Sequence, residues 1–226
     1  MAQTIKLKSP LDGFEFGALQ ANAEGRRRGG IVIIQEIFGI DRYVKDDVAR
    51  WAAMGFEAVA PSMFDRQKPG FLADHDPAGI EEGRRLATAN GMENPASDVQ
   101  ACVDYLKAKG PVFIVGYCYG GSIAWLAAAK VTGLAAASCY YGGRIQEIID
   151  LKLKCPLICH FGRKDAHIPA EAIKAAIEKA HPNVPVFIYE NSGHGFNNAG
   201  REDADPADAE LARQRTLELF EASGAK

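Results

Sequence analysis

Short apolar runs alternate along this chain with stretches in which apolar residues recur at helical spacing. Residues 31–36 and 111–115 are apolar runs of strand length, typical of parallel strands that are covered on both faces. Val44, Val48 and Trp51 recur at the spacing of one helix face. Strands that alternate with helices predict a three-layer α/β fold, in which a mostly parallel sheet carries helices on both faces.

The same patterns predict where each element lies. Residues 4–8 and 14–20 are expected to form a β-hairpin, because Asp12-Gly13 between them is a turn signal. Asp76-Pro77 supplies an N-cap and a proline at the first helical position, and Gly79 and Gly83 weaken the helix that follows. The remaining strands are expected at 31–36, 57–60, 111–115, 134–141, 156–161 and 184–189, and the remaining helices at 42–54, 97–109, 122–130, 169–180 and from 206 onward, the last with Leu211, Leu217 and Phe220 on one side.

Length and charge narrow the class of protein. With 226 residues, 47% of them hydrophobic, the chain can bury one full core. No repeat, low-complexity tract or linker divides it, so we expect a single domain over residues 1–226. A net charge of −3 gives no electrostatic reason to expect nucleic acid or a membrane surface as a partner.

The cysteines and the N-terminus indicate the compartment. No apolar run reaches the length of a membrane span, and the first residues lack the apolar segment of a signal peptide. The five cysteines are odd in number and lie mostly in apolar stretches, which favours reduced thiols. Cys155 and Cys159 have no second pair at zinc-finger spacing, so no metal site is expected. We expect a cytoplasmic monomer.

The segment Gly116-Tyr117-Cys118-Tyr119-Gly120-Gly121 has the spacing of a nucleophile elbow, with cysteine in place of serine. It lies between an expected strand and an expected helix, which is the context that such an elbow requires. The glycines allow a sharp, strained turn, and the N-terminus of the following helix favours a thiolate. A cysteine that only fills space in the core is the alternative; the context favours catalysis by Cys118.

A nucleophilic cysteine needs a base, and the base needs a group that orients it. In hydrolases with this elbow, the acid and then the histidine follow the nucleophile along the chain. Asp165 and His194 lie in glycine-containing loops, each just after an expected strand. Because the carboxyl ends of parallel strands gather ligands at one edge of the sheet, we expect Cys118, Asp165 and His194 to form a catalytic triad. A helix N-terminal role ahead of Pro169 is the alternative for Asp165.

The other histidines have less favourable positions. His160 lies inside an apolar strand and is expected to be a hydrogen-bonded core residue, and His181 precedes a proline at a helix end. His167 is too close to the acid loop to be the base, although it can line the site. His75 precedes the nucleophile and fits a surface loop.

Glu36 ends an expected strand and precedes the turn at Ile37-Phe38-Gly39. In this type of hydrolase an amide after that strand and the amide after the nucleophile bind the oxyanion. We therefore assign the backbone N–H groups of Ile37 and Tyr119 to the oxyanion hole. Glu36 itself is either a second carboxylate of the site or a strand-end residue that reaches water, and the residue types leave both open.

Taken together, these motifs resemble the dienelactone hydrolase family of α/β-hydrolases. The likeness rests on residues 35–39, 116–121, 162–165 and 193–196, and extends over nearly the whole chain. It implies an enzyme without a cofactor that opens enol-lactones such as dienelactone (4-carboxymethylenebut-2-en-4-olide), as in the degradation of chlorinated aromatic compounds. It also implies that the resting cysteine is a neutral thiol held near Glu36, which deprotonates it when the substrate arrives.

The resemblance also indicates where a substrate would bind. In the family two arginines hold the substrate carboxylate, and one of them corresponds here to Asn198. An ungapped comparison aligns the other with Ile80, so Arg84 or Arg85, one turn later, can take its place. Loss of a bidentate cation would weaken the binding of a carboxylate. The candidate substrate contacts are Arg84, Arg85, Asn198, Phe38, Tyr140 and Tyr141.

The expected reaction is attack of the Cys118 thiolate on a lactone carbonyl, which gives a thioester that water then hydrolyses with His194 as base. Two alternatives remain. The first is a carboxylesterase or thioesterase of the same fold that acts on a different, neutral ester. The second is a thiol sensor that kept the fold but has no turnover.

Overall fold

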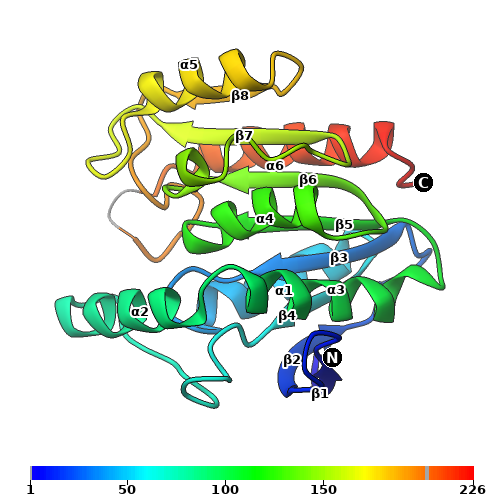
Figure 1. The fold of residues 1–226 in the computed structure, drawn as a ribbon. Helices are drawn as coiled ribbons and strands as arrows, with labels where there is room; N and C mark the ends of the chain where they lie inside the picture. Colours follow the sequence, from blue (N-terminus) through cyan, green and yellow to red (C-terminus); the bar gives the residue numbers. More distant parts are fainter. Residues whose placement is uncertain (1, 202–203) are drawn as a thin grey trace.

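The computed structural model describes residues 2–201 and 204–226, and its centre is one eight-stranded sheet with the order β1-β2-β4-β3-β5-β6-β7-β8 (Figure 1). The pairs β1–β2 and β2–β4 are antiparallel, and every pair from β4 to β8 is parallel. The strands are β1 (Gln3–Lys8), β2 (Glu15–Ala21), β3 (Gly29–Ile34), β4 (Phe56–Pro61), β5 (Val112–Tyr117), β6 (Leu134–Tyr140), β7 (Leu157–Gly162) and β8 (Val186–Tyr189).

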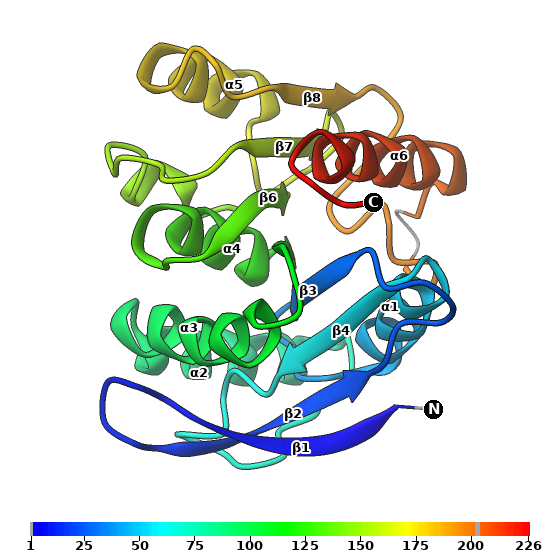
Figure 2. The ribbon, with the colours of Figure 1, turned by 90° about the vertical axis from the view of Figure 1, so that its right-hand side faces the viewer.

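Helices cover both faces of this sheet, as the alternating pattern predicts. Figure 2 shows α3, α4 and α5 on one face and α1 and α6 on the other, and α2 reaches beyond the carboxyl ends of the parallel strands in Figure 1. The helices are α1 (Arg42–Ala53), α2 (Pro77–Asn90), α3 (Glu93–Lys107), α4 (Tyr119–Lys130), α5 (Ala170–Ala180) and α6 (Pro206–Ala222), with a short 3-10 helix η1 (Ile145–Glu147).

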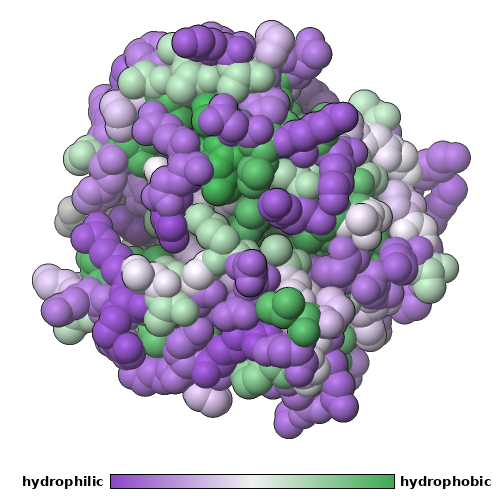
Figure 3. All heavy atoms as spheres, in the orientation of Figure 1, coloured by the Kyte–Doolittle hydropathy of each residue, from purple (hydrophilic) through white to green (hydrophobic). Residues whose placement is uncertain are grey.

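Burial explains the composition of the central strands. All six residues of β3, β4, β5 and β7 are buried, because helices exclude water from both faces, so these strands are continuously apolar rather than alternating. The view of Figure 3 shows mostly hydrophilic residues, with smaller apolar patches between them. Among the described residues, no helix combines the length and the apolar composition needed to cross a membrane.

All the predicted elements are present, although several begin or end a few residues from the expected position: β3 covers 29–34 rather than 31–36, and α4 begins at Tyr119 rather than at 122. Helix α3 begins at Glu93 rather than at 97, because Pro95 lies in its first turn, where the missing N–H of proline breaks no helical hydrogen bond. The expected apolar side of α6 is wrong for Leu211, which is exposed, whereas Phe220 is buried and Leu217 packs against the core. The other buried residues of the helix are Ala209, Ala212 and Thr216. Helix α6 therefore packs on the core through small side chains, Phe220 and the partly buried Leu217 and Leu219.

Candidate active site

Cys118 lies at the sharp turn between β5 and α4, with φ 54° and ψ −111°. This left-handed conformation is strained for a residue with a Cβ. The turn is possible because a Cβ at Gly116 would lie 1.9 Å from the carbonyl oxygen of Gly120. The Cys118 N–H donates to the carbonyl of Tyr140 at 3.0 Å, which fixes the turn against β6. The structure thus has the strained elbow that the glycines predict, with a half-buried sulfur at the N-terminus of α4.

Asp165 and His194 come from the loops after β7 and β8 and meet at this elbow. The Nδ1 atom of His194 lies 2.7 Å from Oδ2 of Asp165. The other carboxylate oxygen of Asp165 accepts the backbone N–H groups of His167 at 2.8 Å and Ile168 at 3.1 Å. Asp165 is therefore held from two sides, and it fixes the orientation of the imidazole.

Charge and hydrogen bonding shift the pKa of both groups. Burial raises the pKa of Asp165, but the hydrogen bond from His194 and the two backbone N–H groups outweigh it and leave the pKa below its usual value. Burial lowers the pKa of His194, but hydrogen bonds to Asp165 and Cys118 outweigh it and raise the pKa to about 10. His194 thus interacts with both the acid and the sulfur, and both raise its pKa.

This shift makes the stability of the fold depend on pH. A histidine with a pKa of about 10 in the folded chain and 6.5 in the unfolded chain contributes its full stability below pH 6.5 and loses it as the pH rises toward 10. We expect the difference in unfolding free energy between the wild type and His194→Gln to decrease over this range. Urea unfolding at a series of pH values measures that difference, and a constant difference would contradict the expectation.

The amides of Ile37 and Tyr119 flank the same space. Both residues line the cavity that contains Cys118, and in the part of the chain that the structure describes neither N–H has an acceptor. The next amide along α4, that of Gly120, donates instead to the carbonyl of Gln35 at 3.1 Å. This bond joins the elbow to the loop after β3, and it leaves the amides of Ile37 and Tyr119 without an acceptor in residues that line the same cavity.

Glu36 lies in the same cavity and is only 2% exposed. Among the described residues neither of its carboxylate oxygens has a hydrogen-bond partner, and Nη1 of Arg201 lies 3.7 Å from Oε2. The reading of Glu36 as a strand-end residue in water is therefore wrong. The structure brings Glu36 and Cys118 to one cavity, which His194 also lines.

The cavity has a volume of about 510 Å³, within the range of about 300–1,000 Å³ that small-molecule sites occupy. Cys118, His194 and Glu36 lie on its wall. His167 lies there too, in agreement with the expectation that it can line the site. Helix α2 forms another wall through residues at helical spacing, namely Ile80, Arg84, Ala87, Thr88 and, just after its end, Gly91.

The predicted substrate contacts divide into two groups. Phe38 and Arg84 line the cavity. Arg85 does not, because its side chain is 61% exposed and forms an ion pair with Glu82 at 2.7 Å. Asn198 does not line it either: it is buried, and its side chain accepts the N–H of Gly200 within its own turn.

The two tyrosines after the elbow lie behind the cavity wall. Tyr140 is buried, and its hydroxyl lies 3.1 Å from that of Thr216 on α6. Tyr141 is fully buried with its ring centroid 4.8 Å from that of His194. Its hydroxyl donates to Asn197, whose amide in turn donates to the hydroxyl of Tyr43 on α1. Neither tyrosine lines the cavity; both support it.

Sequence reasoning missed Arg201 and Arg144, which also line the cavity. The carbonyl of Gly195 accepts the N–H of Asn198, and the carbonyl of Asn198 accepts the N–H of Arg201. These successive turns bring the Arg201 side chain back over Gly195. The only sequence signal for Arg201 was a basic residue in the same loop as His194. The direction of the Arg201 side chain depends on turns that the sequence does not specify.

Comparison with known proteins identifies the family of this fold and site. A sequence model described as the dienelactone hydrolase family matches residues 16–224. The chain belongs to the dienelactone hydrolase family. A carboxymethylenebutenolidase of Pseudomonas putida is 33% identical over 229 residues, which cover 97% of this chain and 96% of the relative. Carboxymethylenebutenolidase 1 of Cupriavidus pinatubonensis is 31% identical, with 92% of each chain covered.

The fold agrees with this membership of the dienelactone hydrolase family. The crystal structure of a putative dienelactone hydrolase from Klebsiella pneumoniae matches with a TM-score of 0.82 at 24% identity, covering 98% of this chain and 99% of the other. The resemblance inferred from the four motifs is confirmed, and the protein is a hydrolase of carboxylic esters or lactones.

Proposed function

We propose that this hydrolase opens enol-lactones of the dienelactone type through a thioester on Cys118. The observation that carries the proposal is the meeting of Cys118, His194 and two unpartnered amides at one cavity, with His194 hydrogen-bonded to Asp165. A thiolate next to an imidazolium is a strong nucleophile. An enol leaving group departs easily, so such a site needs little assistance to break the lactone ring.

In the first half of the reaction, the Cys118 thiolate attacks the lactone carbonyl. The carbon–sulfur bond forms, and the amides of Ile37 and Tyr119 bind the oxyanion. Collapse of this intermediate breaks the ring carbon–oxygen bond and leaves a thioester. The departing enolate takes the proton of the His194 imidazolium.

In the second half, water hydrolyses the thioester. Acylation removes the negative charge of Cys118, which is one of the groups that raise the pKa of His194, so the neutral imidazole can accept a proton from water. The resulting hydroxide attacks the thioester carbonyl in the same oxyanion hole. Thiolate then leaves, the carboxylic acid product forms, and the imidazolium–thiolate pair is restored.

The charges of the cavity favour an anionic substrate. Arg84, Arg144 and Arg201 line it, against Glu36 as the acidic residue on its wall. Arg144 forms a bidentate pair with Glu147, which leaves Arg84 and Arg201 as the better candidates to hold a carboxylate. We propose that Arg201, rather than Asn198, supplies the cation that the family comparison places after the histidine.

Adjacent arginines on α2 provide a matched test of this charge preference. We expect Arg84→Gln to raise KM for a carboxylate-bearing lactone about tenfold or more, because a hydrogen bond to a charged group contributes about 1.5–3 kcal/mol. Arg85→Gln removes the same charge from the outer surface and should leave KM unchanged. Steady-state kinetics with the lactone and with a neutral ester measure both. Equal effects of the two variants would contradict a direct contact.

A substrate panel tests the function itself. The enzyme is assayed with cis- and trans-dienelactone and with neutral aryl and alkyl esters, and we expect the highest kcat/KM for a dienelactone. A cavity of about 510 Å³ with apolar walls at Ile37, Phe38, Ile80 and Ile168 also has room for larger acyl groups. A higher kcat/KM for neutral esters than for dienelactone would contradict the proposed lactone substrate and indicate a carboxylesterase instead.

A further inference from the structure

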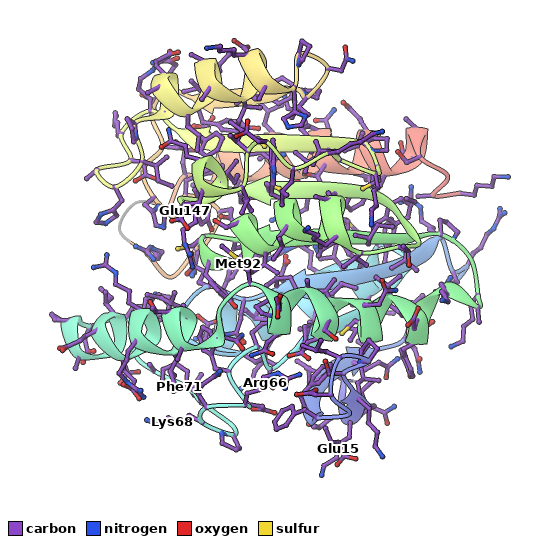
Figure 4. All side chains as sticks on the ribbon, viewed as in Figure 1. Glu15, Arg66, Lys68, Phe71, Met92 and Glu147 are labelled. Carbon is purple, nitrogen blue, oxygen red and sulfur yellow. The ribbon has the colours of Figure 1, made fainter. Side chains whose placement is uncertain are left out.

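The loop that carries the Ile37 amide, residues 35–39, is held through its backbone carbonyls. The carbonyl of Gln35 accepts the N–H of Gly120 at 3.1 Å, and that of Phe38 accepts the N–H of Ala73 at 3.1 Å. Gly39 pairs with Leu72 as an isolated antiparallel bridge. Figure 4 labels Lys68 and Phe71 in the 62–76 segment, which supplies the contacts to Phe38 and Gly39. The carbonyl of Ile37 lies between these points, against helix α2.

Helix α2 contacts that carbonyl through a residue without a side chain. A methyl group at Gly83 would lie 2.2 Å from the carbonyl oxygen of Ile37 and 2.9 Å from its Cβ. Gly83 is buried in the middle of α2, where glycine weakens a helix and alanine would strengthen it. Helix propensity therefore does not explain a glycine at position 83. The close approach of Ile37 explains it, because no side chain would fit there.

We propose that Gly83 is a positioning residue for the oxyanion hole. Its missing side chain lets α2 close on the Ile37 carbonyl, and this contact holds the adjacent Ile37 N–H toward the cavity. The Ala73 N–H holds the next carbonyl of the loop from the other side. This inference rests on the proposed function, because it assigns the Ile37 amide to the oxyanion.

Gly30 provides a control at the start of β3, the end of the strand far from the 35–39 loop. A methyl group there would lie 2.8 Å from Cβ of Leu106 on α3, so Gly30→Ala introduces a clash with a buried helix outside the residues that line the cavity. We expect Gly83→Ala to lower kcat about 10²-fold, the effect of losing one oxyanion donor, with a smaller change in KM. Gly30→Ala should also lower the melting temperature but keep near-wild-type kcat.

Alkylation of Cys118 by iodoacetamide separates the oxyanion hole from the nucleophile, because this displacement forms no oxyanion. We expect Gly83→Ala to keep the wild-type alkylation rate while it loses turnover. If Gly83→Ala does not fold, Ala73→Pro removes the opposite contact from the partly exposed 62–76 segment, and kcat should again fall more than the alkylation rate.

Two outcomes would overturn the role of Gly83. One is equal kcat in Gly83→Ala and Gly30→Ala, and the other is a parallel loss of turnover and alkylation in Gly83→Ala. When Gly83→Ala does not fold, an unchanged kcat in Ala73→Pro overturns it. A wild-type enzyme whose turnover survives complete alkylation of Cys118 would instead defeat the proposed function, so the two failures are distinguishable.

Discussion

Replacement of Cys118 by alanine should lower kcat/KM for dienelactone by about 10⁴-fold or more, the scale of loss when a nucleophile is removed. The expectation follows from the position of the sulfur, which is the half-buried atom at a strained elbow beside His194. No other cysteine has this setting. Burial raises the pKa of Cys155 to about 11, and Cys102 and Cys139 are fully buried with raised pKa values.

Cys155→Ala is the matched control for this experiment, because it removes a half-buried thiol from a separate small cavity. Its kcat/KM should equal that of the wild type. Both variants are compared in initial-rate assays at equal concentrations of folded protein, checked by circular dichroism. Substantial turnover in Cys118→Ala would exclude the thioester route and require a different nucleophile.

Replacement of His194 by alanine should lower kcat about 10³-fold, within the range of about 10²–10⁴ that general base catalysis contributes. Because His194 activates the water of the second half-reaction, we expect the thioester to accumulate. Intact-protein mass spectrometry after a short reaction should show an adduct with the mass of the opened lactone. Peptide mapping should locate it on Cys118.

The control for His194→Ala is His181→Ala. His181 ends helix α5, and its Nε2 lies near the carbonyl of Ile149, outside the catalytic cavity. This variant should turn over normally and accumulate no adduct. An absence of adduct in His194→Ala, with kcat reduced, would mean that the imidazole is needed mainly for the first half of the reaction.

The sequence predicts most of the fold and the centre of the site because the signals there are local. Central strands are recognisable as continuous apolar runs, and the glycines around Cys118 are required by a turn in which backbone oxygens lie 1.9–2.3 Å from where a Cβ would stand. Asp165 and His194 follow strands, so the topology of a parallel sheet brings them together without any knowledge of side-chain directions.

Side-chain direction in loops and on helices is where the prediction fails. Asn198 occupies the family position of an arginine, yet its side chain satisfies its own turn. Arg201, three residues later, enters the cavity because two successive turns reverse the chain. Arg84 and Arg85 differ by one position, which on a helix separates a cavity wall from solvent. Such outcomes depend on packing between distant segments.

The hydroxyl of Tyr43 ties the loop that bears His194 to helix α1, through Asn197, which also accepts from Tyr141. The partners Tyr43 and Asn197 are 154 positions apart along the chain. Unfolding of the first third of the chain would therefore remove one of the contacts that hold the His194 loop. We expect activity to be lost together with the cooperative unfolding of the whole fold, and neither half of the chain to be active as a separate fragment.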